Sequence, residues 1–156
     1  MTEHLDLEDL LAAAEAVLGR PADVRDMGIL EAAVARTKAT VFGAEAYPDL
    51  DAKAGALLHS IVTGHPLVDG NKRLGWVAIR LLYRMNGGDL VEDPGAAFDL
   101  VVAVAEGSLR DVDDIARRLR PWSRSADDLP AGALSEILLG REFAEKVGRS
   151  RHSKPP

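Results

Sequence analysis

Apolar residues recur every three or four positions along most of the chain, which is the period of amphipathic helices. Residues suited to helix ends lie between these apolar stripes. Asp6, Asp93 and Asp111 are suited to N-cap positions, and the pair Gly87-Gly88 is suited to end a helix. The pattern therefore predicts six helices, over about residues 7–18, 26–41, 52–64, 72–85, 94–105 and 112–119.

Strand signals are nearly absent from the same pattern. Only Leu90-Val91-Glu92 has the composition of a short extended segment, and residues 43–50, which contain Tyr47-Pro48, are predicted to form a loop. We therefore predict an all-α fold, a compact single-domain bundle of about six helices joined by short connections.

The composition changes after Trp122. Residues 123–130 are polar and linker-like, and a further apolar pattern predicts an extra amphipathic helix over residues 133–147. We expect a main domain over residues 1–122 and a C-terminal extension over residues 123–156 that ends in a basic tail.

Net charge and composition limit the classes of partner that we expect for the protein. The 156 residues carry a net charge of −6, so nucleic acid would repel the chain unless a local basic patch intervened. The chain has no cysteine, which excludes disulfides and thiolate metal sites. It has no apolar run long enough to span a bilayer and no basic signal segment at its start. We expect a cytoplasmic protein whose partners are proteins or small molecules, with no direct nucleic-acid or membrane contact.

Residues with chemical potential gather in one loop before the fourth predicted helix, His65-Pro66-Leu67-Val68-Asp69-Gly70-Asn71-Lys72-Arg73. The first N–H groups of a helix have no intrahelical partner and lie at the positive end of its dipole. Gly70 allows a tight bend and a close approach of a ligand, and Lys72 and Arg73 add two positive charges. The pattern predicts a phosphate-binding site.

Two further side chains extend this site from binding to chemistry. Asp69 is poorly suited to contact phosphate but well suited to Mg²⁺, which prefers one or two carboxylates together with substrate phosphates. His65 is suited to accept a proton from a hydroxyl at neutral pH. The loop thus combines a base, a carboxylate that can bind magnesium, an anion site and two cations. ATP-dependent transfer of a phosphorus-containing group requires these parts.

Each of these residues alone has a simpler explanation. A histidine at a helix end usually stabilises that end, an aspartate there is usually an N-cap, and adjacent cations usually form a solvated surface. Their combination within nine positions favours the phosphate site over these separate explanations.

The same loop resembles the motif of the Fic/Doc family, and within it the Doc branch of toxins. The family pattern H-x-F-x-(D/E)-G-N-(G/K)-R matches residues 65–73 except at Leu67, where phenylalanine is usual. The resemblance extends over about residues 5–122 and implies a Fic/Doc-like catalytic domain there. It implies a flap over residues 42–51 that aligns the target protein. It also implies roles for the motif residues: catalytic base for His65, Mg²⁺ ligand for Asp69, anion-site glycine for Gly70, and nucleotide-phosphate ligands for Asn71 and Arg73.

Lys72 indicates which phosphate is transferred. In the family, relatives that transfer AMP usually have glycine here, whereas Doc toxins have lysine and bind the nucleotide inverted, with its γ-phosphate presented. The resemblance thus implies a toxin that phosphorylates a hydroxyl of a target protein, elongation factor Tu in Doc toxins, and so blocks translation. Adenylylation of a protein hydroxyl is the second interpretation. A catalytically idle module that binds an antitoxin is the third.

The resemblance also implies a protein that inhibits the toxin. Some family members carry an inhibitory helix with the pattern S/T-x-x-x-E-G/N, and residues 135–140 are the nearest match. Leu139 occupies the position of the key glutamate, so we expect inhibition by a separate antitoxin protein.

Overall fold

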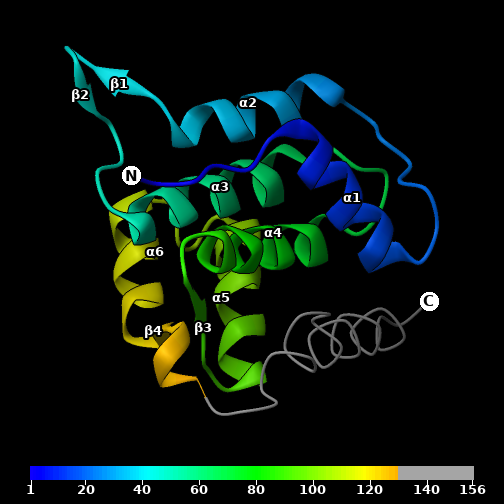
Figure 1. Cartoon of the computed structure of the whole chain (residues 1–156). Coiled ribbons are helices and arrows are strands. Elements are labelled where there is room, and N and C mark those ends of the chain that lie inside the picture. Colours follow the sequence, from blue (N-terminus) through cyan, green and yellow to red (C-terminus); the bar gives the residue numbers. More distant parts are fainter. Residues whose placement is uncertain (130–156) are drawn as a thin grey trace.

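The computed structural model describes residues 1–129, and helices dominate this part of the chain (Figure 1). The predicted all-α class and the six helices are confirmed, whereas the extra helix predicted over residues 133–147 lies outside the described residues. None of the helices described is both long enough and apolar enough to cross a membrane. The helices are α1 (Leu7–Leu18), α2 (Met27–Thr37), α3 (Leu50–Gly64), α4 (Asn71–Met85), α5 (Pro94–Glu106) and α6 (Val112–Leu119), followed by two short 3-10 helices, η1 (Arg120–Trp122) and η2 (Ala126–Asp128).

Helix α3 lies at the centre of the bundle and contacts α2, α4, α5 and α6 (Figure 1). Its residues from Ala52 to Leu58 are all buried, as expected for a helix with neighbours on every side. Glycines let two of these neighbours approach closely. A Cβ atom added at Gly55 would lie 3.1 Å from the backbone oxygen of Val112 in α6, and one added at Gly75 of α4 would lie 2.6 Å from Val62 Cγ1 of α3.

Aspartate side chains define where most of the helices begin. Asp6, Asp26, Asp49, Asp93 and Asp111 each accept a hydrogen bond from a backbone N–H group in the first turn that follows. Such caps satisfy donors that the helix itself leaves without partners. The caps predicted at residues 6, 93 and 111 are confirmed.

A small hairpin, β1 (Thr40–Val41) and β2 (Ala44–Glu45), projects from the bundle before α3 (Figure 1). Its two central residues, Phe42 and Gly43, both have positive φ angles, of 51° and 81°. Two positive φ angles are characteristic of the tight turns that join hairpin strands. The prediction that Val41 lies on the apolar side of a helix is wrong, because α2 ends at Thr37 and Val41 is 56% exposed in the hairpin.

A buried lysine fastens this hairpin to the bundle. Lys53 of α3 is 0% exposed, and its ammonium group donates to Glu45 Oε1 at 3.3 Å and to the backbone oxygen of Tyr47. Arg36 of α2 adds a hydrogen bond of 2.9 Å from its Nε to the hydroxyl of Tyr47. A buried cation without partners would be costly, so these contacts oppose displacement of the hairpin base.

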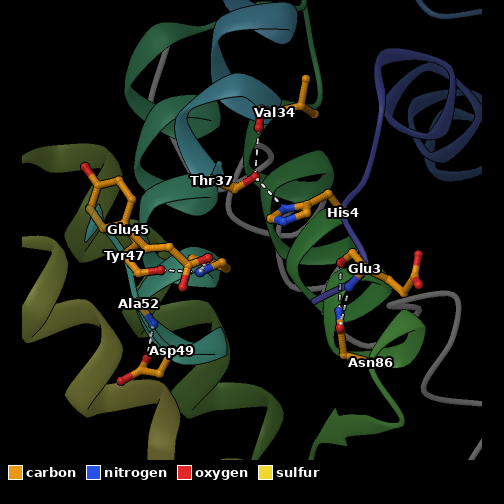
Figure 2. A network of polar contacts seen from close by, with 10 residues as sticks. Glu3, His4, Val34, Thr37, Glu45, Tyr47, Asp49, Ala52 and Asn86 are labelled. Atoms are coloured by element: carbon orange, nitrogen blue, oxygen red, sulfur yellow. Dashed lines mark hydrogen bonds and ion pairs between the residues drawn. The ribbon is translucent and has the colours of Figure 1, made fainter. Parts of the chain in front are cut away.

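Hydrogen bonds also attach the N-terminal segment of the chain to residues at the ends of α2 and α4 (Figure 2). Asn86, at the end of α4, exchanges two hydrogen bonds with the backbone of Glu3, of 2.8 and 2.9 Å. His4 Nδ1 lies 3.3 Å from the hydroxyl of Thr37, which in turn donates to the backbone oxygen of Val34. The N-terminal segment thereby connects the ends of α2 and α4.

A second two-stranded sheet closes the bundle after the helices. Strand β3 (Gly88–Leu90) pairs antiparallel with β4 (Ser123–Ser125). The linker-like character predicted for residues 123–130 is therefore wrong for the first three, which complete a sheet. Of the predicted extended segment Leu90-Val91-Glu92, only Leu90 lies in β3. Both short strands depend on a partner distant in sequence, which local composition does not reveal.

Two acidic residues at β3, the buried Asp89 and the partly buried Glu92, differ in their hydrogen-bond partners. Asp89 is 1% exposed and accepts from Arg80 at 3.0 and 2.8 Å and from Arg84 at 2.8 Å. Glu92 has a buried Oε2 atom with no hydrogen-bond partner among residues 1–129. Burial raises the pKa of Glu92 from 4.5 to about 7, against the attraction of Arg80. The folded chain therefore holds a proton on Glu92 that the unfolded chain releases at lower pH.

We predict that Glu92→Gln stabilises the protein above pH 7 and changes it little at pH 4.5. Because the folded pKa is the higher one, the wild-type free energy of unfolding falls as pH rises from 4.5 to about 7 through this group. After discounting for partial exposure to solvent, we expect the variant to gain about 1–2 kcal/mol at pH 8. Urea denaturation of both proteins at pH 4.5, 6 and 8 measures this, and parallel pH profiles would contradict it.

Candidate active site between α3 and α4

His65 occupies the C-cap position of α3 in an unusual backbone conformation. Its φ and ψ angles are 52° and 57°, in the left-handed region, and its N–H group donates to the backbone oxygen of Ile61 at 3.2 Å. The left-handed conformation is common at this position but is usually adopted by glycine. It turns the chain out of α3, and the side chain of His65 is exposed. The predicted base is thus accessible to a substrate.

The loop that follows His65 pairs with the connection between α1 and α2. The backbone N–H groups of Arg25 and Asp26 donate to the oxygen of Pro66 at 2.7 and 3.0 Å, and Val68 donates to Asp23 at 3.0 Å. Val24 and Leu67 form an antiparallel bridge within this pairing. Residues 23–26, which we call the 23–26 segment, therefore hold the loop from outside the motif.

Asn71 holds the same loop from the other side. Its Oδ1 accepts from the Leu67 N–H group at 2.8 Å, and its Nδ2 donates to the Leu67 oxygen at 2.9 Å. Leu67 itself is 1% exposed and lies in the core. Leucine thus fills the position where the family pattern has phenylalanine. In this conformation both polar groups of the Asn71 side chain serve the loop backbone, so its expected role as a phosphate ligand stays a prediction.

The N-terminus of α4 has the features of an anion site. Gly70 is its N-cap, with a φ angle of 87°, and has no side chain to cover the first turn. A Cβ atom there would lie 2.8 Å from Leu18 Cδ2, so only glycine fits without displacement. The free backbone donors of the first turn and the helix dipole both favour a negatively charged ligand.

Arg73 provides the clearest sign that a ligand belongs here. Its Nε atom is buried and has no hydrogen-bond partner among residues 1–129. Its Nη2 atom lies 3.8 Å from Asp69 Oδ2, which is an ion pair but too long for a hydrogen bond. Buried donors in native structures almost always have an acceptor. An anion with several oxygens, such as a phosphate group, would supply one.

The remaining predicted residues lie in the same turn. Asp69 accepts from the Gly70 N–H group at 2.8 Å and is partly exposed, as is Lys72. Within the described residues no group of three His, Cys, Asp or Glu side chains could hold a metal. A magnesium ion at Asp69 would therefore have one protein carboxylate and take its other ligands from phosphate and water, a set that Mg²⁺ accepts.

The flap expected over residues 42–51 begins in the hairpin, which is attached at the other end of α3. It leads into Leu50, whereas the motif loop leaves from Gly64 (Figure 1). The 15 residues of α3 separate these two points by about 22 Å. Its tip residue Phe42 is fully exposed. Its role in alignment of a target remains a prediction.

Comparison with known proteins places these features in a family. The model of the Fic/DOC family matches residues 4–83, which include α1 to α3, most of α4, the 23–26 segment and the motif loop. A curated relative from Mycolicibacterium smegmatis (strain ATCC 700084 / mc(2)155), "Toxin Doc", is 46% identical over 128 residues. The alignment covers 81% of this chain and 98% of the relative. The chain belongs to the Fic/DOC family. The predicted Fic/Doc resemblance is thereby confirmed.

Within this Fic/DOC domain the structure brings all six predicted site residues into one loop and helix turn. It also reveals a participant that the sequence did not indicate, because Arg25 lies 40 residues before His65. The only signal available was an arginine directly before the N-cap aspartate of α2, and that arrangement is common on protein surfaces.

We predict that Asn71→Ala lowers the free energy of unfolding by about 1–3 kcal/mol, because it leaves the buried N–H and C=O groups of Leu67 without partners. Urea denaturation measures this loss. The matched control is Asn86→Ala, which removes similar bonds to the exposed Glu3 and should cost less. Equal losses in the two variants would show that the Asn71 contacts do not hold the loop.

Proposed function

We propose that this chain is the toxin of a toxin–antitoxin pair and transfers the γ-phosphate of ATP to a hydroxyl group of a target protein. The observation that carries the proposal is the buried Nε of Arg73 at the start of α4, which has no hydrogen-bond partner within residues 1–129. Lys72 lies in the same turn, and His65 is exposed at the beginning of the loop. The name of the Mycolicibacterium smegmatis relative supports the toxin part of the proposal.

The proposed chemistry assigns one step to each part of the site. The target hydroxyl oxygen attacks the γ-phosphorus, its proton passes to a ring nitrogen of His65, and the bond between the γ-phosphorus and the bridging oxygen breaks. ADP leaves, and His65 later releases the proton to solvent. Arg73, Lys72 and the first N–H groups of α4 stabilise the charge on the phosphate oxygens. Magnesium held at Asp69 would supply additional neutralisation of that charge.

The resemblance to Doc toxins implies elongation factor Tu as the target and arrest of translation as the consequence. A chain that blocks translation in its own cell requires a protein that restrains it, so the proposal includes an antitoxin partner. The target lies in the cytoplasm, and the toxin would act there.

We predict that the purified chain labels elongation factor Tu from ATP that is radioactive at the γ-phosphate, and not from ATP that is radioactive at the α-phosphate. His65→Asn should lower this labelling by at least about 100-fold, because it removes the base. Asparagine tolerates the positive φ angle at this position better than alanine would. The matched control is Thr63→Ala, an exposed position in the last turn of α3.

The alternative functions give different results in the same assay. Label from the α-phosphate alone would identify an adenylyltransferase, with pyrophosphate as the leaving group. No label from either ATP, together with growth arrest that survives His65→Asn, would identify a binding module without catalysis. A cell lysate in place of elongation factor Tu tests whether another protein is the target.

Lys72 offers a separate test of the phosphate that is transferred. If its side chain occupies the space and charge that an α-phosphate would otherwise use, Lys72→Gly should increase labelling from the α-phosphate relative to the γ-phosphate. Lys72→Ala is the matched control, because it removes the charge without the backbone freedom of glycine, which costs about 1 kcal/mol in a helix. The ratio of α to γ label measures the effect, and an unchanged ratio in Lys72→Gly would refute this role of Lys72.

A further inference from the structure

Arg25 makes an unusual set of contacts with the motif loop, although it lies outside the motif. Its Nε donates to the backbone oxygen of His65 at 2.7 Å and its Nη2 donates to that of Gly64 at 2.8 Å. Its own backbone N–H group donates to the oxygen of Pro66 at 2.7 Å. One residue therefore binds three consecutive carbonyl groups at the end of α3.

The two side-chain contacts fall on the peptide groups that flank His65. The Gly64 oxygen belongs to the peptide before the His65 Cα atom, and the His65 oxygen belongs to the peptide after it. The orientations of these two planes define the φ and ψ angles of His65, which are 52° and 57°. A planar guanidinium group with its donors in a fixed geometry restrains both planes at once, which an ammonium group cannot do equally well.

Among the described residues, the restraint on these two carbonyl groups comes from Arg25 alone. Within residues 1–129, Arg25 is the only hydrogen-bond donor to the oxygens of Gly64 and His65. The next residues of the loop have their own partners, since Pro66 accepts from the backbone of the 23–26 segment and Leu67 is bound by Asn71. The conformation at His65 thus depends on a side chain, whereas that of the following residues depends on the backbone and on Asn71.

The position of Arg25 is itself well defined. Asp26 accepts from the Ile29 N–H group and begins α2 directly after Arg25. A Cβ atom at Gly64 would lie 2.7 Å from Ile29 Cγ2, so the start of α2 lies directly against the end of α3. The arginine is therefore presented to the loop by a capped helix start that lies against the end of α3.

We propose that Arg25 is a positioning residue for His65, which keeps its backbone in the left-handed conformation and so sets the direction of the imidazole. The catalytic part of this inference rests on the proposed function, because it assumes that His65 is the base. The conformational part stands on the contacts of Arg25 alone. The positive charge at the C-terminal end of α3 adds a favourable interaction with the helix dipole.

The test compares Arg25→Met, which keeps the length of the side chain without its donors, with Arg25→Lys, which keeps the charge without the paired geometry. Arg20→Met is the matched control, since Arg20 is exposed in the same connection between α1 and α2 and, in the part of the chain that the structure describes, forms no hydrogen bond with the loop. For Arg25→Met we expect kcat for protein labelling to fall by about 10- to 100-fold, with KM for ATP within about twofold of wild type. Arg25→Lys should retain an intermediate kcat.

A second readout does not depend on activity. The backbone chemical shifts of His65 in NMR spectra report its φ and ψ angles, and amide hydrogen exchange at residues 64–68 reports the order of the loop. In Arg25→Met we expect the His65 shifts to leave the left-handed range and the exchange of these amides to accelerate at least tenfold. Arg20→Met should match wild type in both. If the wild-type chain labels no protein, the proposed function fails, but these measurements still decide the conformational part.

Two results would overturn the inference. Unchanged His65 shifts in Arg25→Met, with exchange and kcat near wild type, would show that Arg25 does not restrain His65. A loss of thermal stability in Arg25→Met with kcat near wild type below the unfolding transition would assign Arg25 a merely structural role as a helix cap.

Discussion

The backbone of the loop between α3 and α4 is bound by hydrogen bonds on two sides, and the course of the chain from His65 to the start of α4 depends on these bonds. The 23–26 segment binds it on one side and Asn71 binds it on the other. Loops usually satisfy their backbone polar groups with water, but this loop buries Leu67 in the core and needs protein partners there. The loop held by these bonds leaves His65 exposed and the first residues of α4, Asn71 to Arg73, partly exposed.

Close contact between α3 and α4 sets the ends that the loop must join. Gly75 lies against Val62, and larger residues there would separate the two helices. Because α3 also contacts α2, a shift of α3 would move Gly64 against Ile29 and disturb the 23–26 segment at the same time. The anion site at Gly70 is bounded in a similar way by Leu18 of α1. Four helices therefore contribute to the geometry of a site whose chemical groups come from one short stretch of chain.

Sequence patterns predicted the parts of this arrangement that are local. The helical periods, the caps at Asp93 and Asp111 and the content of the motif depend on neighbours in the chain, and all three follow from residue type and spacing. The hairpin was missed because strands of two residues are too short to show alternation, and Val41 was assigned to a helix for that reason. Strand β4 was missed because its partner β3 lies more than 30 residues earlier.

The contacts of the site that were not predicted are of the same long-range kind. Nothing in the sequence near Arg25 indicates that it binds carbonyl groups 39 and 40 residues later. Nothing near Lys53 indicates that an ammonium group is buried in the central helix α3, where Glu45 and Tyr47 reach it only because the hairpin folds back. Asn71 was predicted to be a phosphate ligand. Its two hydrogen bonds to Leu67 could not be predicted, because they require the loop to bend as the structure shows.

The left-handed backbone at His65 creates a conflict between the stability of the fold and the proposed catalytic role of the imidazole. A residue with a Cβ atom pays about 1–2 kcal/mol to adopt this conformation, whereas glycine adopts it freely. Selection for a more stable fold alone would thus favour glycine at the end of α3, and a redesign for thermal resistance alone would tend to remove the imidazole. The histidine at this position is evidence of a demand other than folding, and engineered stabilisation of the domain should leave residue 65 untouched.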